Sequence, residues 1–242
     1  MGPVRQEVMW QAVLDAVEAV GDAGSGLDVL DVGGGTGGDA VRLAGLGHRV
    51  TVVDPSPDAL AALDRRAAEA GLAGAVTGVL GDTGDLDALR GSADLVLCHG
   101  VIEHVDDPDA ALAAIVTTCR PGALVSVVVP GRQAAALARA LSGDFAAAER
   151  VATTGAQAWD VRSDGARRFT PREVDALLGR HGLGVVTVQG LRVFADLVPS
   201  AVVDADAGSR QRLFALERLV RADPDFLAIS GGLQTIARLD LA

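Results

Sequence analysis

Val29-Leu30-Asp31-Val32-Gly33-Gly34-Gly35-Thr36-Gly37-Gly38 is the stretch that decides the fold of this 242-residue chain. Its first half is apolar and continues from Leu27, which predicts a buried strand. The glycines predict a tight turn, because glycine adopts backbone angles that other residues avoid and lets a ligand approach the backbone. A helix is predicted to begin near Asp39. A strand, a glycine-rich turn and a helix N-terminus in this order are typical of nucleotide-binding sites.

Strands and helices alternate on both sides of this stretch. Strands are predicted at residues 27–32, 49–53, 75–80, 93–98, 123–129, 183–188 and 232–239. Helices are predicted at residues 5–22, 39–45, 57–71, 108–118, 132–150, 171–180 and 209–222, and residues 151–168 are predicted to be irregular. Such alternation favours a parallel sheet with right-handed crossovers.

Composition and charge narrow the class of protein. The chain is 49% hydrophobic but only 3% aromatic, which suits closely packed helices on a parallel sheet. It has no apolar run near the ~20 residues of a membrane span and no signal-peptide pattern at its start, so we expect a soluble, cytoplasmic protein. Two cysteines form no disulfide framework, and four histidines make a metal site unexpected. A net charge of −11 repels nucleic acid unless basic residues gather on one face.

The choice of nucleotide depends on the acidic residues. Gly33-x-Gly35-x-x-Gly38 matches the dinucleotide fingerprint, and an NAD-binding oxidoreductase is one alternative. However, Asp31, Asp54 and Asp82 lie in or after successive strands, whose ends line one crevice in an open parallel sheet. Carboxylates suit a ligand with hydroxyls, an amine and a positive charge better than they suit a pyrophosphate. S-adenosylmethionine has all three. A non-catalytic cofactor-binding or scaffold protein is a further alternative.

Five motifs resemble those of the class I S-adenosylmethionine-dependent methyltransferases. They are the opening stretch, residues 52–56, Gly81-Asp82-Thr83, residues 94–105 and residues 120–124, and together they cover about residues 27–130. The resemblance implies an α/β, Rossmann-like, doubly wound and mostly parallel seven-stranded sheet with an antiparallel last strand. We expect one domain over 1–242. It has an N-terminal helix (1–26), a cofactor-binding core (27–130), a helical lid insert (131–170) and the rest of the sheet (171–242).

The resemblance also implies a cofactor site. Its predicted residues are Arg5, Asp31, Gly33, Gly34, Gly35, Gly37, Asp54, Pro55, Gly81, Asp82, Thr83, His99, Gly100 and His104. Asp54 is expected to bind the ribose diol, and Asp82, with Asp85 as the competing residue, to accept from the adenine amine. Arg5 is predicted to hold the methionine carboxylate, or else is a surface charge. Methyl transfer would leave S-adenosylhomocysteine.

Stretches outside these motifs resemble the bacterial tRNA carboxymethoxyuridine methyltransferase family, which esterifies a carboxylate on the wobble base. They are residues 4–6 with 10–11, 98–103, 141–145 and 190–196, so the similarity extends over nearly the whole chain. That family's lysine-rich lid segment is replaced here by residues 151–164, which contain no lysine and only one arginine, Arg162. A tryptophan of its fourth motif is replaced by His104. The acceptor is therefore predicted to be tRNA or a small anionic molecule. A small-molecule O- or N-methyltransferase of secondary metabolism is the alternative.

Two residues are predicted to be catalytic. Arg192 follows the sixth strand, and its guanidinium could orient an anionic acceptor bidentately, although a surface salt bridge is the ordinary interpretation. His99 ends the fourth strand beside the expected methyl group. A carboxylate acceptor needs no base, whereas a hydroxyl or amine would need one, and His99 is then the candidate. Cys98 is expected to be a buried small residue. Dimerisation through the alanine-rich helices stays open.

Overall fold

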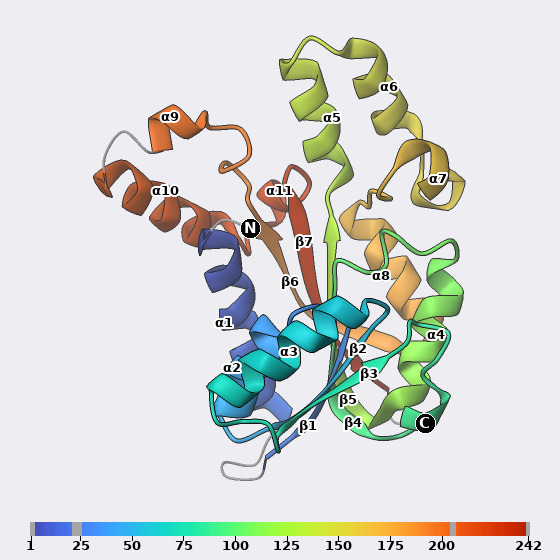
Figure 1. Ribbon diagram of the computed structural model, residues 1–242. Helices are drawn as coiled ribbons and strands as arrows, with labels where there is room; N and C mark the ends of the chain where they lie inside the picture. The colour runs from blue at the N-terminus through green and yellow to red at the C-terminus, as the bar shows by residue number, and fades with distance from the viewer. Residues whose placement is uncertain (1–2, 21–25, 204–206, 241–242) are drawn as a thin grey trace.

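A computed structural model describes residues 3–20, 26–203 and 207–240 of the protein (Figure 1). Its strands form one seven-stranded sheet in the order β3-β2-β1-β4-β5-β7-β6. The strands are β1 (Asp28–Val32), β2 (Arg49–Asp54), β3 (Val76–Leu80), β4 (Ala93–His99), β5 (Cys119–Pro130), β6 (Leu183–Leu191) and β7 (Gly232–Leu239). Neighbours among β1 to β5 pair in parallel, whereas β7 is antiparallel to both β5 and β6. The predicted fold class is thus confirmed.

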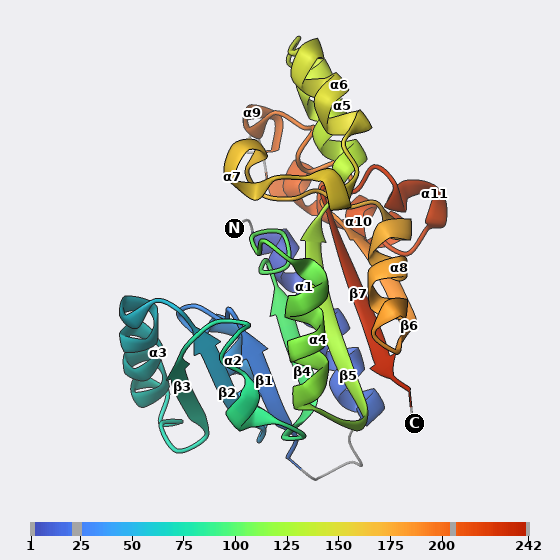
Figure 2. The ribbon, with the colours of Figure 1, turned by 90° about the vertical axis from the view of Figure 1, so that its right-hand side faces the viewer.

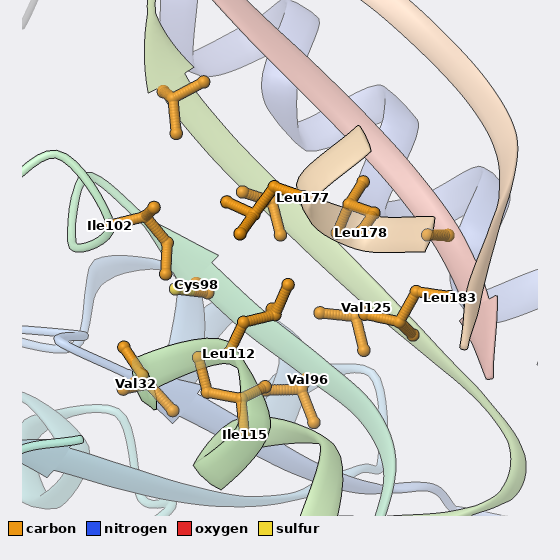
Figure 3. Close-up of a cluster of buried hydrophobic side chains, with 14 of the residues drawn as sticks. Val32, Val96, Cys98, Ile102, Leu112, Ile115, Val125, Leu177, Leu178 and Leu183 are labelled. Atoms are coloured by element: carbon orange, nitrogen blue, oxygen red, sulfur yellow. The ribbon is translucent and has the colours of Figure 1, made fainter. Parts of the chain in front are cut away.

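Helices cover both faces of the sheet (Figure 2). Those longer than a single turn are α1 (Pro3–Val20), α2 (Gly38–Gly45), α3 (Pro57–Glu69), α4 (Pro108–Thr118), α5 (Arg132–Leu141), α6 (Phe145–Thr153), α8 (Pro171–Arg180) and α10 (Ala207–Val220). Side chains of α1, α2 and α3 pack on one face, and those of α4 and α8 on the other. Figure 3 shows Leu112 and Ile115 of α4 and Leu177 and Leu178 of α8, which belong to the same buried cluster over the strands. Burying these faces is the main source of stability.

Several helix starts follow the chemistry that the sequence predicts. Ser56 caps α3 by accepting a hydrogen bond from the Ala59 amide, with Pro57 at the first helical position. Thr170 and Glu173 form the predicted capping box at the start of α8. These local signals are readable from sequence because each involves residues at most three positions apart.

The segment between β5 and α8 differs from its prediction. Residues 132–150 were expected to form one helix, but α5 ends at Leu141 and α6 begins at Phe145. Gly143 has a φ of 81° and Asp144 caps α6 through the Ala147 amide, so the chain turns back on itself. The predicted irregular stretch 151–168 contains a 3₁₀ turn (Ala156–Ala158) and α7 (Val161–Asp164). The one-turn helices α9 (Ser200–Val203) and α11 (Pro224–Leu227) were not predicted, and β5 begins four residues earlier than expected.

The two ends of this segment lie side by side. Gly131 and Phe169 form an isolated parallel bridge, in which the Arg132 amide donates to Phe169 O (2.8 Å) and the Phe169 amide to Pro130 O (3.0 Å). Helices α5, α6 and α7 stand beyond the carboxyl end of β5 (Figure 1). The first and last residues of the insert are therefore joined by backbone hydrogen bonds. Its role as a lid, like the division of the chain into segments, stays a prediction.

Candidate functional site

A cleft of about 540 Å³ opens at the carboxyl ends of β1, β2 and β4. The sheet order reverses between β1 and β4, and such a switch point is where open α/β sheets bind ligands. Seven of the residues predicted for the cofactor line this cleft: Gly33, Asp54, Pro55, Asp82, Thr83, Gly100 and His104. The structure thus brings together residues that are up to 71 positions apart in the sequence. Their contacts with a cofactor stay a prediction.

The glycine-rich turn between β1 and α2 could not be built from other residues. Gly33 has a φ of 72°, and a Cβ on it would collide with the side chain of Val101, which also lines the cleft. Gly37, at φ 70°, is the N-cap residue of α2, and a Cβ there would collide with Leu63 of α3. The absence of side chains at these two positions therefore lets Val101 and Leu63 pack directly against the turn.

Asp54 links two loops of the cleft. Its Oδ2 accepts from the Gly35 amide (2.8 Å) and its Oδ1 from the Ser56 amide (2.9 Å), although the residue is only 8% exposed. An ionised carboxylate can accept about four hydrogen bonds, so two remain for hydroxyl groups of a ligand. Asp54 could thus shape the glycine turn and bind a ribose diol at the same time.

The loop after β3 places Asp82, and not its competitor Asp85, on the cleft. Asp82 Oδ1 accepts from the Gly84 amide (2.6 Å), and Asp85 Oδ2 accepts from the Asp82 amide (3.1 Å). Gly81 joins this loop to β2 by donating its amide to Asp54 O (3.3 Å). Asp85 therefore shapes the loop, which leaves Asp82 as the better candidate for an adenine amine.

Asp31 and Gly34 lie behind the cleft. Asp31 is 5% exposed on β1, and a Cβ on Gly34 would collide with its carboxylate. Burial raises the pKa of Asp31 to about 7, and the charges of Asp39 and Asp54 add to the rise. A group with this pKa holds a proton in mildly acidic solution and is negatively charged in mildly basic solution.

We expect Asp31→Asn to flatten the dependence of stability on pH. Between the ordinary pKa and about 7 the folded protein binds a proton that the unfolded chain has released. The free energy of unfolding of the wild type therefore falls as pH rises over this range, by about 2–3 kcal/mol from about pH 5 to about pH 8. Urea denaturation of both proteins at the two pH values measures the difference. Parallel pH profiles would contradict the assignment.

His99 belongs to a chain of polar side chains that crosses four neighbouring strands. Its Nε2 lies 2.7 Å from Ser126 Oγ of β5, which also accepts from Gln234 Nε2 of β7 (3.3 Å). Gln234 Oε1 in turn accepts from Gln189 Nε2 of β6 (2.7 Å), and its amide nitrogen donates to Met9 O (3.2 Å). His99 is half-buried and is not one of the described residues that line the cleft. Its catalytic role stays a prediction.

The sequence contained a signal for this network that the motif analysis did not use. Ser126, Gln189 and Gln234 are polar residues inside otherwise apolar strands, and such residues need partners when buried. Cys98, by contrast, is fully buried in the core, and burial raises the pKa of its thiol far above the ordinary range. It is therefore no candidate nucleophile.

Arg192 lies in a second cavity, of about 290 Å³, whose described lining shares no residue with the cleft. It has a φ of 58°, unusual for a residue other than glycine. Its Nη1 donates to Asp196 Oδ1 (3.1 Å) and its Nη2 to Gly231 O (3.2 Å). Arg139 and Arg168 line the same cavity. The structure thus gives Arg192 a pocket of its own, beside the cofactor cleft.

Two buried charged residues missed by the sequence analysis hold this region in place. Glu217 of α10 is 2% exposed, and it accepts from the amides of the three residues that follow Arg192, at 2.8–2.9 Å. Arg167 is 4% exposed and donates to four backbone carbonyl oxygens. A signal for Glu217 did exist, because it occupies the inward face of α10 together with Leu213 and Val220.

Some predicted features lie outside the described part of the chain. The backbone of Arg5 belongs to α1, but its side chain is not among those described. Within the described residues, no three His, Cys, Asp or Glu side chains gather as a metal ion would need. None of the helices described there is long and apolar enough to cross a membrane.

Comparisons with known proteins find methyltransferases among the relatives of this chain. A family model described as a methyltransferase domain matches residues 29–122. The tRNA 5-carboxymethoxyuridine methyltransferase of Escherichia coli K12 is 28% identical over 145 residues, which cover 60% of this chain and 55% of that protein. A ubiquinone biosynthesis O-methyltransferase of Xanthomonas euvesicatoria is 32% identical over 69% of this chain and 66% of that protein. The chain therefore spans between about half and two thirds of these curated relatives.

Solved structures show the same fold. The geranyl diphosphate C-methyltransferase of Streptomyces coelicolor, in complex with S-adenosyl-L-homocysteine, superposes with a TM-score of 0.65 at 15% identity, over 96% of this chain and 76% of that one. S-adenosylmethionine is thus the cofactor that the comparisons support. A methyltransferase-domain model matches residues 29–122, and together with the curated relatives and the shared fold it supports a class I S-adenosylmethionine-dependent methyltransferase.

Proposed function

We propose that the protein transfers the methyl group of S-adenosylmethionine to an oxygen atom of an anionic acceptor. The observation that carries this proposal is the carboxylate of Asp54, which is fixed by the Gly35 and Ser56 amides and still has hydrogen-bonding capacity toward the cleft. The backbone of Gly33 lines the same cleft. Dinucleotide phosphates, by contrast, would meet several carboxylates here.

The chain's own part in the reaction is mostly positioning. When bound, the cofactor supplies a methyl group on a positively charged sulfur. Asp54 would hold the ribose, Asp82 the adenine amine, and the backbone of the Gly33 turn would lie against the ligand. Holding the two reactants in line and excluding water can provide most of the acceleration. A carboxylate acceptor needs no general base, so His99 would serve as a base only for a hydroxyl acceptor.

The first candidate acceptor is the carboxylate of a wobble carboxymethoxyuridine in tRNA. It is supported by the E. coli relative and by the stretches that this chain shares with that family outside the cofactor motifs. The second candidate is a small carboxylate or phenol. It is supported by the similarity to ubiquinone biosynthesis O-methyltransferases and by the net charge of −11, which repels RNA.

Methyl-labelled S-adenosylmethionine distinguishes these candidates. The protein is incubated with bulk tRNA from a strain that lacks the wobble methyl ester and, separately, with a panel of small carboxylates and phenols. Alkali-labile label in RNA supports the first candidate, and label in a small product supports the second. Tighter binding of NAD than of S-adenosylmethionine, or bound cofactor that never turns over with any acceptor, would contradict the proposed activity.

We expect Arg192→Gln to weaken acceptor use without weakening cofactor binding. The lost hydrogen bonds to a charged acceptor group are each worth about 1.5–3 kcal/mol, so the KM for the acceptor should rise about tenfold or more. The dissociation constant for S-adenosylmethionine should stay within about twofold, because Arg192 lies outside the described lining of the cleft. Arg90→Gln, which changes the same charge on an exposed surface, is the control. Equal losses in both affinities would refute the role of Arg192.

A further inference from the structure

The cavity that contains Arg192 is positively charged in an acidic protein. Arg139, Arg168 and Arg192 line it together with a single acid, Asp196, so its formal charge is +2 against −11 for the whole chain. The rest of its lining is glycine and small or aliphatic side chains from α5 and from the loops after β6 and before β7. At about 290 Å³ it is at the small end of the range for ligand pockets.

Arg168 is the arginine of this cavity whose positive charge has the least support from bonded partners. It is half-buried, and no hydrogen bond or ion pair of its guanidinium is found among the described residues. Burial lowers the pKa of Arg168. The charge of Glu103 opposes this effect, the charges of Arg139 and Arg192 lower the pKa further, and Asp196 raises it. A bound anion would remove this cost, because buried charges are stable when they are paired.

The other two arginines also have donors to spare. Arg192 uses Nη1 and Nη2 on Asp196 and Gly231, and its buried Nε has no partner among the described residues. The nearest oxygen of Asp144 is 3.9 Å from Arg139 Nη1, beyond hydrogen-bond distance. Three guanidiniums with five N–H donors each therefore line a cavity whose lining has one carboxylate, Asp196, while Asp144 forms a long ion pair with Arg139 and Glu103 acts on Arg168 from outside that lining. The carboxylate of Asp196 cannot accept hydrogen bonds from all of these donors.

The cavity adjoins the cofactor cleft through Glu103. The Glu103 carbonyl accepts from the Arg167 amide (2.8 Å), which holds the Arg168 segment against the turn after β4. On its other side, Glu103 Oε1 lies 3.7 Å from where a Cβ of Gly100 would be, and Gly100 lines the cleft. A small molecule in the cavity would thus be a neighbour of a ligand in the cleft.

We infer that this cavity binds a small dianion, either a dicarboxylate or a phosphomonoester, through Arg168 and Arg192 with Arg139 at its rim. If the proposed function holds, this dianion is part of the methyl acceptor, which makes that acceptor a small molecule with two negative charges. Binding itself does not depend on methyl transfer. The inference can therefore fail while the methyltransferase activity stands, and the reverse is also possible.

Calorimetric titration of the whole protein with inorganic phosphate, succinate and acetate tests this inference. Phosphate or succinate should bind about tenfold or more tightly than acetate, because the second charge forms further charge-assisted hydrogen bonds. Phosphate alone would identify a phosphomonoester site, and succinate alone a dicarboxylate site. Arg168→Gln should weaken the dianion about tenfold or more, whereas Arg90→Gln, on an exposed surface, should not. Asp196→Asn should strengthen it, because this variant removes the one acid of the cavity.

Two results would overturn the inference. The first is equal binding of mono- and dianions, or binding of none of the three probes by a protein that still binds S-adenosylmethionine. The second is unchanged dianion affinity in Arg168→Gln with thermal stability equal to that of the wild type. A protein that binds the dianion but no cofactor would instead refute the proposed function and leave the anion site standing.

Discussion

Asp54→Asn is expected to raise the dissociation constant for S-adenosylmethionine by at least about 100-fold. The reason is that the two hydrogen bonds from the ribose hydroxyls to the carboxylate, worth about 1.5–3 kcal/mol each, are weakened. The wild-type carboxylate accepts from the amides of Gly35 and Ser56. An asparagine can offer only its carbonyl oxygen to one of them, and its NH₂ group would face the other N–H. The variant therefore damages the shape of the glycine turn as well as the ribose contact. Calorimetric titration with the cofactor measures the change.

The control for this prediction is Asp58→Asn. Asp58 is an exposed acid in the first turn of α3, four residues after Asp54, and its side chain does not line the cleft. The two variants change the net charge equally, so a difference between them reports the position and not the charge. Circular dichroism and thermal unfolding establish that Asp54→Asn still folds. A folded Asp54→Asn protein with wild-type affinity would remove Asp54 from the cofactor site.

Most of the fold was predictable because its signals are local. The seven strands are apolar runs, and the capping box of α8 spans only Thr170 to Glu173. The break between α5 and α6 was missed because alanine favours a helix throughout residues 132–150, whereas the turn depends on Gly143 and the Asp144 cap. A periodic pattern shows where a helix can form, but a single cap decides where it ends.

The two cavities of the candidate site also differ in how far the sequence predicts them. The cofactor cleft follows from motifs at the ends of consecutive strands, which the sheet necessarily brings to one edge. The second cavity combines α5, the residue before Phe169 and the loop after β6, which meet only in the tertiary structure. Arg167 and Arg168 are neighbours in sequence, yet the first is buried against backbone carbonyls and the second lines the cavity. No sequence pattern separates them.

Glu217 offers the largest expected effect on stability. Its carboxylate accepts three backbone amides, from Val193, Phe194 and Ala195, and it is 2% exposed. Glu217→Ala would leave one buried and two half-buried N–H groups without their acceptor, at about 1–3 kcal/mol each. We therefore expect a loss of at least about 3 kcal/mol in the free energy of unfolding, which is a fall of about 6 °C or more in Tm for a chain of this length. Urea and thermal denaturation measure both quantities, with the exposed Glu149→Ala of α6 as the control.

A second variant at this position, Glu217→Gln, tests how Arg192 is held. The three amides that Glu217 binds belong to the residues directly after Arg192, whose left-handed backbone conformation costs energy and persists only if its surroundings fix it. Releasing the loop should let Arg192 leave the cavity, so acceptor use should fall in Glu217→Gln even below the Tm of that variant. Cofactor affinity should change little, because the cleft is built from β1, β2 and β4. A destabilised Glu217→Gln protein with normal acceptor kinetics would show that the position of Arg192 does not matter for the reaction.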